Sequence, residues 1–535
     1  MAARTDNRDI GLSNAGKCTN CYRIKEWKDA PLNPDLFLPT PNEFIPSRLD
    51  LLPEEGQGTV PCIIKDTSMM RLWHCQDNHF ALPKAHLTAD FVTPLAYSDP
   101  VNVSLTSVWV LLLRDALQQF AYSAELAGLR WNISNSKSGI SVSIDGFDDK
   151  QHVLLDKIVD IIVNFKTDPS RFDIMKENHI RAIKNFEAEQ PYQHAMYQQA
   201  LCLSDFVWTR EQLLEAARVM TSDQLDNYVS RLIRKVHVEA FMYGNIDKDR
   251  ALKMADNLEN MLPKDATPLL PQQMLLYREI ELDKGTAYIS EVENSVHKSS
   301  CSMIYFPCGV RNTRYNVILE LIAQLISEPC FFVLRTKEQL GYIVFSGLRR
   351  ANGVQGLRVL VQSDRHPSFL DDRIEAFLQY IETHITEMSD EEFEKHRAAL
   401  AAHKLEKPKR LSAKASQLWS EIAGQMYNFD RRRVEVEELK TVTRDEVMQL
   451  FKKYISVNSE ERQKLSVYVV STAKGGAGLT QAEDKTVTDS DNSSDRPRIE
   501  ATRISDLIEF KSRRRLYPHP APFNNIPRKG TQCKL

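Results

Sequence analysis

Two stretches of this sequence share one order of predicted elements, and this duplication constrains the fold more than any other feature. Each copy reads as strand, long helix, two strands, several helices and a closing strand. Glu125 in the first copy stands 213 positions before Glu338 in the second, and Gly128 stands equally far before Gly341. So long a period indicates tandem domains, not a solenoid. We therefore predict an α+β fold of two tandem homologous domains, each a mostly antiparallel sheet with helices packed on one face.

The chain of 535 residues is too long for one hydrophobic core, so several segments are expected. The first 50 residues are rich in Pro, Asn and Asp, and the composition turns to Gly, Ser and Asp after Ser471. The predicted segments are an extended N-terminal strap (1–50), a first α+β domain (51–280), a second α+β domain that carries the run RTKEQLGY (281–472), a flexible linker (473–500) and a basic C-terminal tail (501–535).

Charge and hydropathy give no reason to expect a nucleic acid or a membrane as partner. The formal net charge is only -3, and the longest apolar run near the start of the fold, Val108–Leu113, is far shorter than the roughly 20 residues of a membrane span. The first 30 residues lack the apolar stretch of a signal peptide. Nine cysteines, an odd number, favour reduced thiols in a cytoplasmic protein. Cys18 and Cys21 have CxxC spacing but no second pair, so free thiols are preferred over metal or redox use.

The stretch 327–363 contains the strongest candidate site. We expect a helical turn from Glu328 to Leu340 that starts at its proline, then a strand from Tyr342, a turn around Asn352-Gly353 and a return strand. Arg335 and Tyr342 would then flank a helix-to-strand junction, where side chains often serve sites. From the residues alone, the alternative remains that Tyr342 packs and Arg335 pairs with Glu338.

The run RTKEQLGYIVFSG, with SEPCF, RRANG and AEQPYQHAMY (188–197), resembles the insulin-degrading enzyme family of pitrilysin-type (inverzincin) zinc metallopeptidases. The likeness extends roughly from Asn42 to Ser471 and covers only the C-terminal half of such enzymes. The resemblance implies one half of a clamshell peptidase: the substrate-binding half of a zinc metalloendopeptidase that cleaves small peptide hormones and amyloid-like peptides. The alternative is a catalytically inactive peptide-binding or regulatory protein that pairs with full-length relatives.

The same resemblance implies cofactors and partners. In the family, zinc is bound by the HxxEH motif of the N-terminal half, and none of the 13 histidines here forms HxxEH or HExxH. We therefore expect no metal ligands in this chain and no hydrolysis by the chain alone. The expected partners are peptide substrates, a catalytic N-terminal half or a full-length relative, and a second copy in a homo-oligomer, since the family forms dimers.

Two residues at the junction receive roles from the resemblance, and two phenylalanines just upstream are further candidates. The tyrosine that matches Tyr342 reaches the scissile carbonyl, and the arginine that matches Arg335 holds the substrate. A phenol can donate a hydrogen bond to a developing oxyanion. Phe331 and Phe332 are candidates for the wall of a substrate pocket, although they fit a core equally well.

A basic run forms a second candidate site, for a nucleotide or another polyanion. Its residues are Glu406, Lys407, Pro408, Lys409, Arg410, Leu411 and Ser412. Lysine and arginine satisfy phosphate oxygens by charge-assisted bonds, and the resemblance links the similar segment to ATP or polyphosphate as a regulator. The alternative is a solvated basic corner between two helices. The last three residues, Cys533-Lys534-Leu535, resemble a peroxisomal address, so the expected location is cytoplasmic or peroxisomal.

Overall fold

The computed structural model describes Lys28 and residues 41–53, 60–274, 276–479 and 500–524. Cys18, Cys21, most of the predicted strap and the last three residues lie outside this part. The chain divides into a unit Met1–Glu43 and a unit Phe44–Leu535. All the strands and helices below belong to the second unit.

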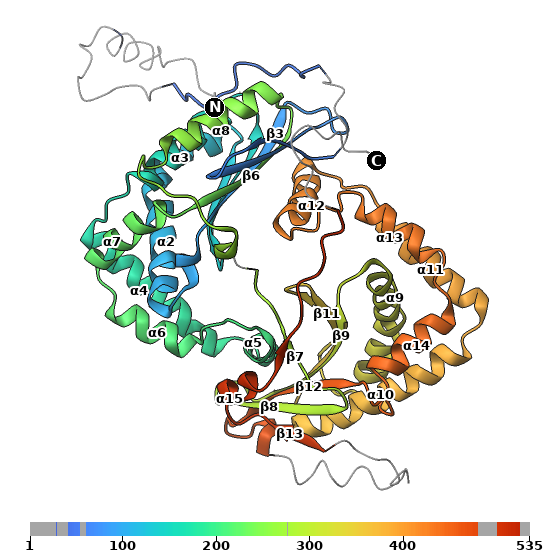
Figure 1. Ribbon diagram of the computed structural model, residues 1–535. Coiled ribbons are helices and arrows are strands. Elements are labelled where there is room, and N and C mark those ends of the chain that lie inside the picture. The colour runs from blue at the N-terminus through green and yellow to red at the C-terminus, as the bar shows by residue number, and fades with distance from the viewer. Residues whose placement is uncertain (1–27, 29–40, 54–59, 275, 480–499, 525–535) are drawn as a thin grey trace, which may run out of the picture. The chain divides into compact units, whose positions relative to one another are not determined.

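The first sheet has six strands in the order β1-β2-β6-β3-β5-β4, and only β2 and β6 pair in parallel. Figure 1 labels β3 and β6 of this sheet. Its strands are β1 (Cys62–Asp66), β2 (Met70–Gln76), β3 (Lys84–Val92), β4 (Arg130–Ser136), β5 (Gly139–Phe147) and β6 (His237–Gly244). The helices of this part of the chain are α2 (Pro100–Leu126), α3 (Gln151–Val163), α4 (Pro169–Asn185), α5 (Pro191–Leu203), α6 (Arg210–Val219), α7 (Ser222–Ile233) and α8 (Lys248–Met261).

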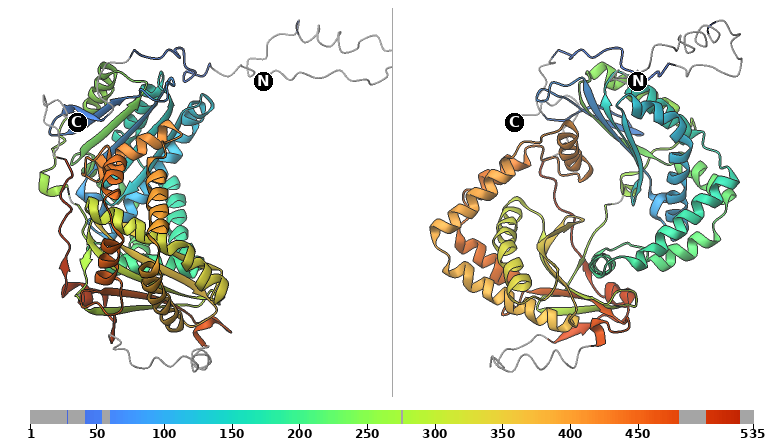
Figure 2. Two further views of the ribbon diagram at one scale, coloured as in Figure 1. Left: turned by 90° about the vertical axis from the view of Figure 1, so that its right-hand side faces the viewer. Right: turned by 180° about the vertical axis from the view of Figure 1, so that it is seen from behind.

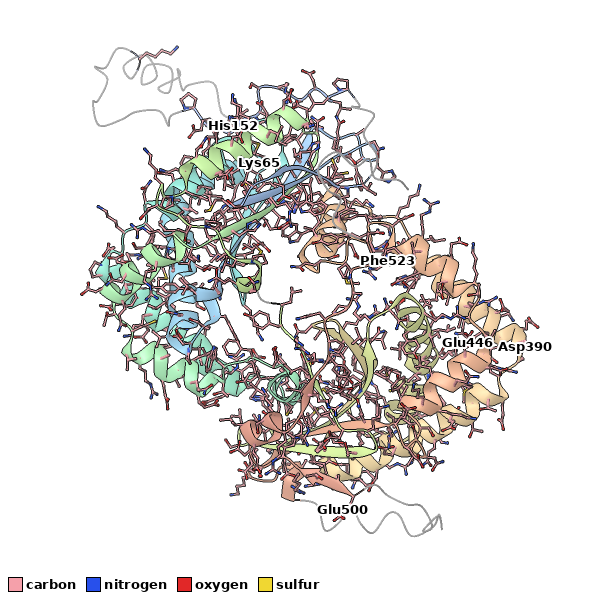
Figure 3. All side chains as sticks on the ribbon, viewed as in Figure 1. Lys65, His152, Asp390, Glu446, Glu500 and Phe523 are labelled. Atoms are coloured by element: carbon pink, nitrogen blue, oxygen red, sulfur yellow. The ribbon has the colours of Figure 1, made fainter. Side chains whose placement is uncertain are left out.

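The alternation of apolar and polar residues gives this sheet one core face. Ile140, Val142 and Ile144 of β5 are buried, whereas the serines between them lie on the other face. The core face packs against α2, α3 and α8, and the first core also takes in residues of α4, α6 and α7. Lys65 of the edge strand β1, labelled in Figure 3, forms ion pairs with Asp256 and Glu259 of α8 and so holds this edge to its helix.

The second sheet repeats this plan with the order β10-β11-β9-β12-β8-β13, in which β10 and β13 are the edges. Its strands are β8 (Thr286–Asn294), β9 (Ser300–Val310), β10 (Ile343–Ala351), β11 (Val354–Ser363), β12 (Gln463–Ser471) and β13 (Ala501–Arg503), and β7 (Ile280–Glu281) pairs separately with β14 (Arg515–Leu516). The helices are α9 (Thr313–Cys330), the π-helix η4 (Phe331–Lys337), α10 (Pro367–Glu387), α11 (Asp390–Leu405), α12 (Leu411–Ala423), α13 (Arg431–Leu439), α14 (Arg444–Tyr454) and α15 (Leu507–Ser512).

Each sheet also receives one helix from the other half of the chain. Ala195, Cys202 and Leu203 of α5 pack on the face of the second sheet opposite α9 and α10. In return, Leu411, Ala415 and Leu418 of α12 pack against Trp73 and Phe241 of the first sheet. Figure 1 labels both helices, and the right-hand view of Figure 2 shows the orange α12 beside the first sheet from behind. The predicted fold class is confirmed. The structure adds α12 on the second face of the first sheet, and α5 together with Phe510 of α15 on the second face of the second sheet.

The C-terminal segment that we predicted as a basic tail is folded where the structure describes it. Strand β13 extends the second sheet, and Phe510 and Tyr517 are buried. The guanidinium of Arg278 donates to the carbonyl oxygens of Leu516 and Tyr517. Of the predicted linker, residues 480–499 lie outside the described part, and Ala477–Leu479 form a short 3-10 helix, η5. Residues 501–524 are therefore part of the body of the protein.

Within the part of the chain that the structure describes, one helix, Thr313–Lys337, is long and apolar enough to cross a membrane by length and composition alone. Half of its most apolar window is buried inside the protein. Val317, Leu321 and Ile322 belong to the core between this helix and the second sheet. Burial of this kind is typical of the central helix of a folded domain.

Candidate functional site

The candidate site lies where α9 leads into β10, and the helix there departs from α-helical geometry. Pro329 does not start a helix, as we predicted, but lies inside α9, which continues directly into the π-helix η4. The prediction was wrong because buried neighbours, among them Ile326, Cys330 and Leu334, hold the helix in place across the missing N–H. The amide of Glu338 donates to the carbonyl of Val333 at 2.9 Å, five residues back. Such π-helical turns are rare and often mark functional sites.

The backbone after η4 turns sharply before the strand begins. Gln339 has a φ of 53°, a left-handed conformation that residues other than glycine seldom adopt. A Cβ at Gly341 would lie 2.0 Å from the carbonyl oxygen of Gln362, so only glycine allows this close approach to β11. Strain of this kind is concentrated at sites where the structure needs a particular side chain in a particular place.

The turn leaves the Tyr342 side chain 81% exposed. The equivalent residue of the first copy, Leu129, is 1% exposed, and it follows the regular helix α2. The two copies therefore differ at the point that the sequence marks as the candidate site. An exposed phenol next to an edge strand is free to meet a ligand.

The guanidinium of Arg335 lies between two aromatic rings. Its central carbon is 4.4 Å from the centre of the Tyr342 ring and 4.6 Å from that of Phe331. Glu338 does not pair with Arg335, as the alternative interpretation required, but forms two hydrogen bonds of 2.8 Å with Arg373 of α10. Cation–π contacts of this kind hold an arginine in a fixed orientation and leave its N–H groups available for a ligand.

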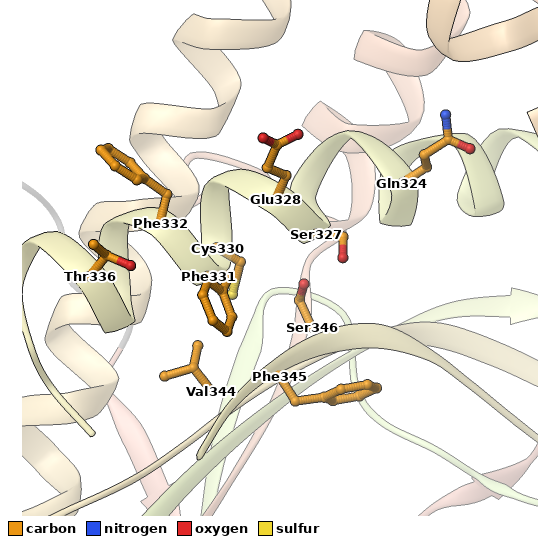
Figure 4. Close-up of a pocket in the computed structure, with 10 residues that line it drawn as sticks. All are labelled: Gln324, Ser327, Glu328, Cys330, Phe331, Phe332, Thr336, Val344, Phe345 and Ser346. Atoms are coloured by element: carbon orange, nitrogen blue, oxygen red, sulfur yellow. The ribbon is translucent and has the colours of Figure 1, made fainter. Parts of the chain in front are cut away.

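A cavity of about 600 Å³ lies between the C-terminal end of α9, η4 and β10 (Figure 4). Its lining residues are Gln324, Ser327, Glu328, Cys330, Phe331, Phe332, Thr336, Val344, Phe345 and Ser346. In Figure 4 the Phe331 ring points from the helix toward Val344, whereas Phe332 projects to the other side of the helix. Both phenylalanines are about half exposed, as is Phe345. A cavity of this size, with apolar walls and a few polar groups, suits a side chain of a ligand.

The structure adds residues that sequence reasoning missed. Phe345 stands in an unbroken apolar run from Tyr342, so no alternation in the sequence shows which of these side chains is exposed. Cys330 also lines the cavity, and burial raises the pKa of its thiol to about 11, which keeps it protonated. The turn between β10 and β11 was predicted correctly. Asn352 and Gly353 both have positive φ, and Ala351 pairs with Val354, as in a type I′ hairpin.

The basic run lies between α11 and α12 and is only partly available to a ligand. Lys407, Lys409 and Arg410 are exposed, whereas Leu411 is buried in the core that joins α12 to the first sheet. Lys409 forms a 3.1 Å ion pair with Glu406, and this hydrogen bond lowers the pKa of the Glu406 carboxyl. Pro408 and Ser412 are half-buried. The run therefore offers a ligand three exposed cations, whereas the Leu411 side chain is buried and not available for contact.

Among the described residues, no group of three or more His, Cys, Asp or Glu side chains is placed to hold a metal ion. The residues of this candidate site, an arginine, a tyrosine and several phenylalanines, do not include a zinc ligand set.

Comparisons with known proteins agree on one group of relatives. Residues 20–216 match the middle or third domain of peptidase M16, and residues 321–419 match the C-terminal lobe domain 4 of PqqF-like PQQ synthase. The chain is 42% identical over 532 residues to insulin-degrading enzyme of Drosophila melanogaster. The aligned region covers 98% of this chain and 52% of that protein. The chain is 44% identical over 451 residues to the Homo sapiens enzyme of the same name, covering 84% of this chain and 44% of that protein. The chain thus spans about half the length of the curated relatives it matches.

Two further relatives bear on location and fold. A protein of Arabidopsis thaliana named "Insulin-degrading enzyme-like 1, peroxisomal" is 33% identical over 453 residues, which are 83% of this chain and 47% of that protein. The crystal structure of pitrilysin matches the fold with a TM-score of 0.77 at 22% identity, covering 91% of this chain and 49% of that one. Sequence and fold therefore point to the same family.

Proposed function

The chain belongs to the M16 peptidase family, in the group that contains insulin-degrading enzyme, and from this premise we propose that it is the substrate-binding half of a zinc metalloendopeptidase. Its substrates would be small peptide hormones and amyloid-like peptides, cut in a complex with an HxxEH-bearing half. The proposal includes a homo-oligomer with a second copy of the chain. It also includes a cytoplasmic location, or a peroxisomal one directed by Cys533-Lys534-Leu535. The name of the Arabidopsis relative supports the second location.

One observation carries the proposal. A strained backbone turn holds Tyr342 exposed beside Arg335, whose guanidinium is fixed by two rings. In our proposal Tyr342 donates a hydrogen bond to the oxyanion that develops at the scissile carbonyl, and Arg335 binds a backbone carbonyl of the peptide before and during the reaction. The adjoining cavity takes one apolar side chain of the peptide, between Phe331 and Val344.

A non-enzymatic role remains the second candidate, because the chain contains no HxxEH motif. In that case the same residues would bind peptides and regulate a full-length relative without taking part in hydrolysis. The two candidates share the peptide-binding site and differ in whether Tyr342 affects turnover.

Peptide binding by the purified chain tests the part that both candidates share. We expect Arg335→Ala to weaken binding of a fluorescently labelled peptide about 10- to 150-fold, because a hydrogen bond from a charged group contributes roughly 1.5–3 kcal/mol. Fluorescence anisotropy titration measures this change. Lys337→Ala is the matched control, since it removes an exposed cation from the same π-helix. Equal losses in both variants would show that the site attracts peptides by charge alone and that Arg335 has no specific contact.

We also propose that Lys407, Lys409 and Arg410 bind the phosphates of ATP or polyphosphate, which the exposure of all three side chains supports. Replacing the three by alanine should weaken ATP binding about tenfold or more while the melting temperature stays unchanged, because exposed charges add little to stability. Isothermal titration calorimetry at low salt measures the affinity. The control changes two other exposed cations to alanine, Arg433 of α13 and Lys440, which follows that helix. Unchanged ATP affinity in the triple variant would place the nucleotide elsewhere.

A further inference from the structure

Two arginines project from the face of the second sheet that lies opposite its main core, and only one of them has an acidic partner. Arg349 of β10 forms hydrogen bonds of 2.8 and 3.3 Å with the carboxylate of Glu279, which is 2% exposed. Arg358 of β11 pairs in the ladder with Gly347 and with Tyr305. No ion pair or hydrogen bond of the Arg358 side chain is found among the described residues, and its Nε is buried without a partner.

The position of Arg358 is electrostatically costly. Burial lowers the pKa of its guanidinium, and the neighbouring charge of Arg349 lowers it further. A guanidinium stays protonated at neutral pH even so, because its pKa in water lies far above 7. A half-buried cation without a counter-charge reduces the stability of the folded chain unless an anion reaches it. A half-buried arginine of this kind is typical of a ligand-binding residue, since it does not stabilise the fold.

Phe345 connects this arginine to the candidate site. Phe345 is one of the residues that line the cavity beside η4. In Figure 4 its ring turns away from the helix, to the face of the strand opposite Val344 and Ser346, and it lies 5.4 Å from the central carbon of the Arg358 guanidinium. The ring is folded over Gly347, whose missing side chain leaves room for it: a Cβ there would approach the ring to 2.8 Å. Phe345 is half exposed and stands on the edge strand β10. A peptide that fills the cavity and crosses Phe345 would therefore pass next to Arg358.

We propose that Arg358 binds a carboxylate of the peptide, supplied either by an Asp or Glu side chain or by a free C-terminus. This inference rests on the proposed function and adds to it a charge preference at one position of the substrate. Arginine matches a carboxylate with two parallel N–H donors, so the contact would be directional as well as electrostatic. Arg335 and Tyr342 recognise the peptide backbone in our proposal, whereas Arg358 would select among sequences.

The test compares peptides that differ only in charge. Fluorescein-labelled peptides with a free C-terminus or a C-terminal amide, each with Glu or Gln at successive positions, are titrated into the purified chain and followed by anisotropy. We expect one carboxylate to improve binding about tenfold, and Arg358→Met, which keeps the length of the side chain, to abolish that difference. If amidation of the C-terminus removes the gain in affinity, the C-terminal carboxylate is the group that Arg358 binds. If one Glu→Gln change removes the gain, Arg358 binds that side chain. Arg358→Glu should reverse the preference toward a Lys peptide.

The control is Arg503→Met, at the opposite edge of the same sheet, where Glu291 already pairs with the arginine. This variant should keep the preference for the carboxylate. The melting temperature of Arg358→Met should not fall, because the variant removes an unpaired charge. Peptides that bind equally with and without their carboxylates would overturn the inference and leave the proposed function standing. Failure of every peptide to bind would overturn both.

Discussion

Tyr342→Phe should lower peptide hydrolysis about 10²- to 10³-fold in a complex of this chain with an HxxEH-bearing half of an M16 relative. Removal of one hydrogen-bond donor to an oxyanion typically costs about 2.7–4 kcal/mol of transition-state stabilisation. The affinity for the peptide should hardly change, since the ground-state carbonyl needs this donor less than the oxyanion does. Steady-state kinetics would show the loss in kcat, while Arg335→Ala would raise KM as well.

Tyr122→Phe is the matched control for the tyrosine. Tyr122 is 60% exposed on α2, the helix of the first copy that corresponds to α9. The control should keep full turnover, and both variants should melt at the temperature of the unchanged chain, because neither phenol is buried. If Tyr342→Phe also keeps full turnover, the phenol only packs against Arg335, and the non-enzymatic role becomes the better account.

Glu279→Gln should destabilise the chain by about 3–5 kcal/mol, because it leaves the buried charge of Arg349 without a counter-ion. The Glu279 carboxylate also accepts a hydrogen bond from Asn352 in the β10–β11 turn. The backbone carbonyl of Glu279 accepts from Tyr517 in the C-terminal segment. Glu279 lies in the segment that connects the two sheets. Through its carboxylate and its backbone carbonyl it is bonded both to the β10–β11 hairpin beside the candidate site and to the C-terminal segment. Denaturant unfolding followed by circular dichroism measures the loss.

The double variant Glu279→Gln/Arg349→Gln provides the control for charge. Removing both charges should recover part of the stability, because no buried charge is then left unpaired. A double variant that is less stable than Glu279→Gln alone would mean that the guanidinium stabilises the fold through its contact with Tyr305, 5.4 Å from the ring centre, and not through the ion pair.

Local sequence patterns predicted the elements well and their assembly less well. The alternating Ile140, Val142 and Ile144 and the Asn352-Gly353 turn are local signals, and the structure confirms both. The packing of α5 on the second sheet and of α12 on the first is different. It depends on which apolar faces meet between segments far apart in the sequence, and no periodicity records that choice.

The sequence motif proposes the two main residues of the candidate site, and their roles stay a prediction, whereas the geometry around them could not be predicted from the sequence. Arg335 and Tyr342 were identified from the motif, whereas the π-helix depends on how the buried side chains around Pro329 resist a break in the helix. Composition suggested a tail for residues 501–535, but Tyr517 is buried and its hydroxyl donates to Gln463. That contact joins residues 54 positions apart, so no local signal predicts it.

The most direct measurement is the rate of peptide hydrolysis as the unchanged chain is titrated into a fixed amount of the HxxEH-bearing half. The account predicts that neither component hydrolyses the peptide at an appreciable rate alone, and that the rate rises with added chain and saturates at one chain per catalytic half. A rate that does not respond to the chain, although native mass spectrometry shows the complex, would contradict the central claim that this chain completes a peptidase site.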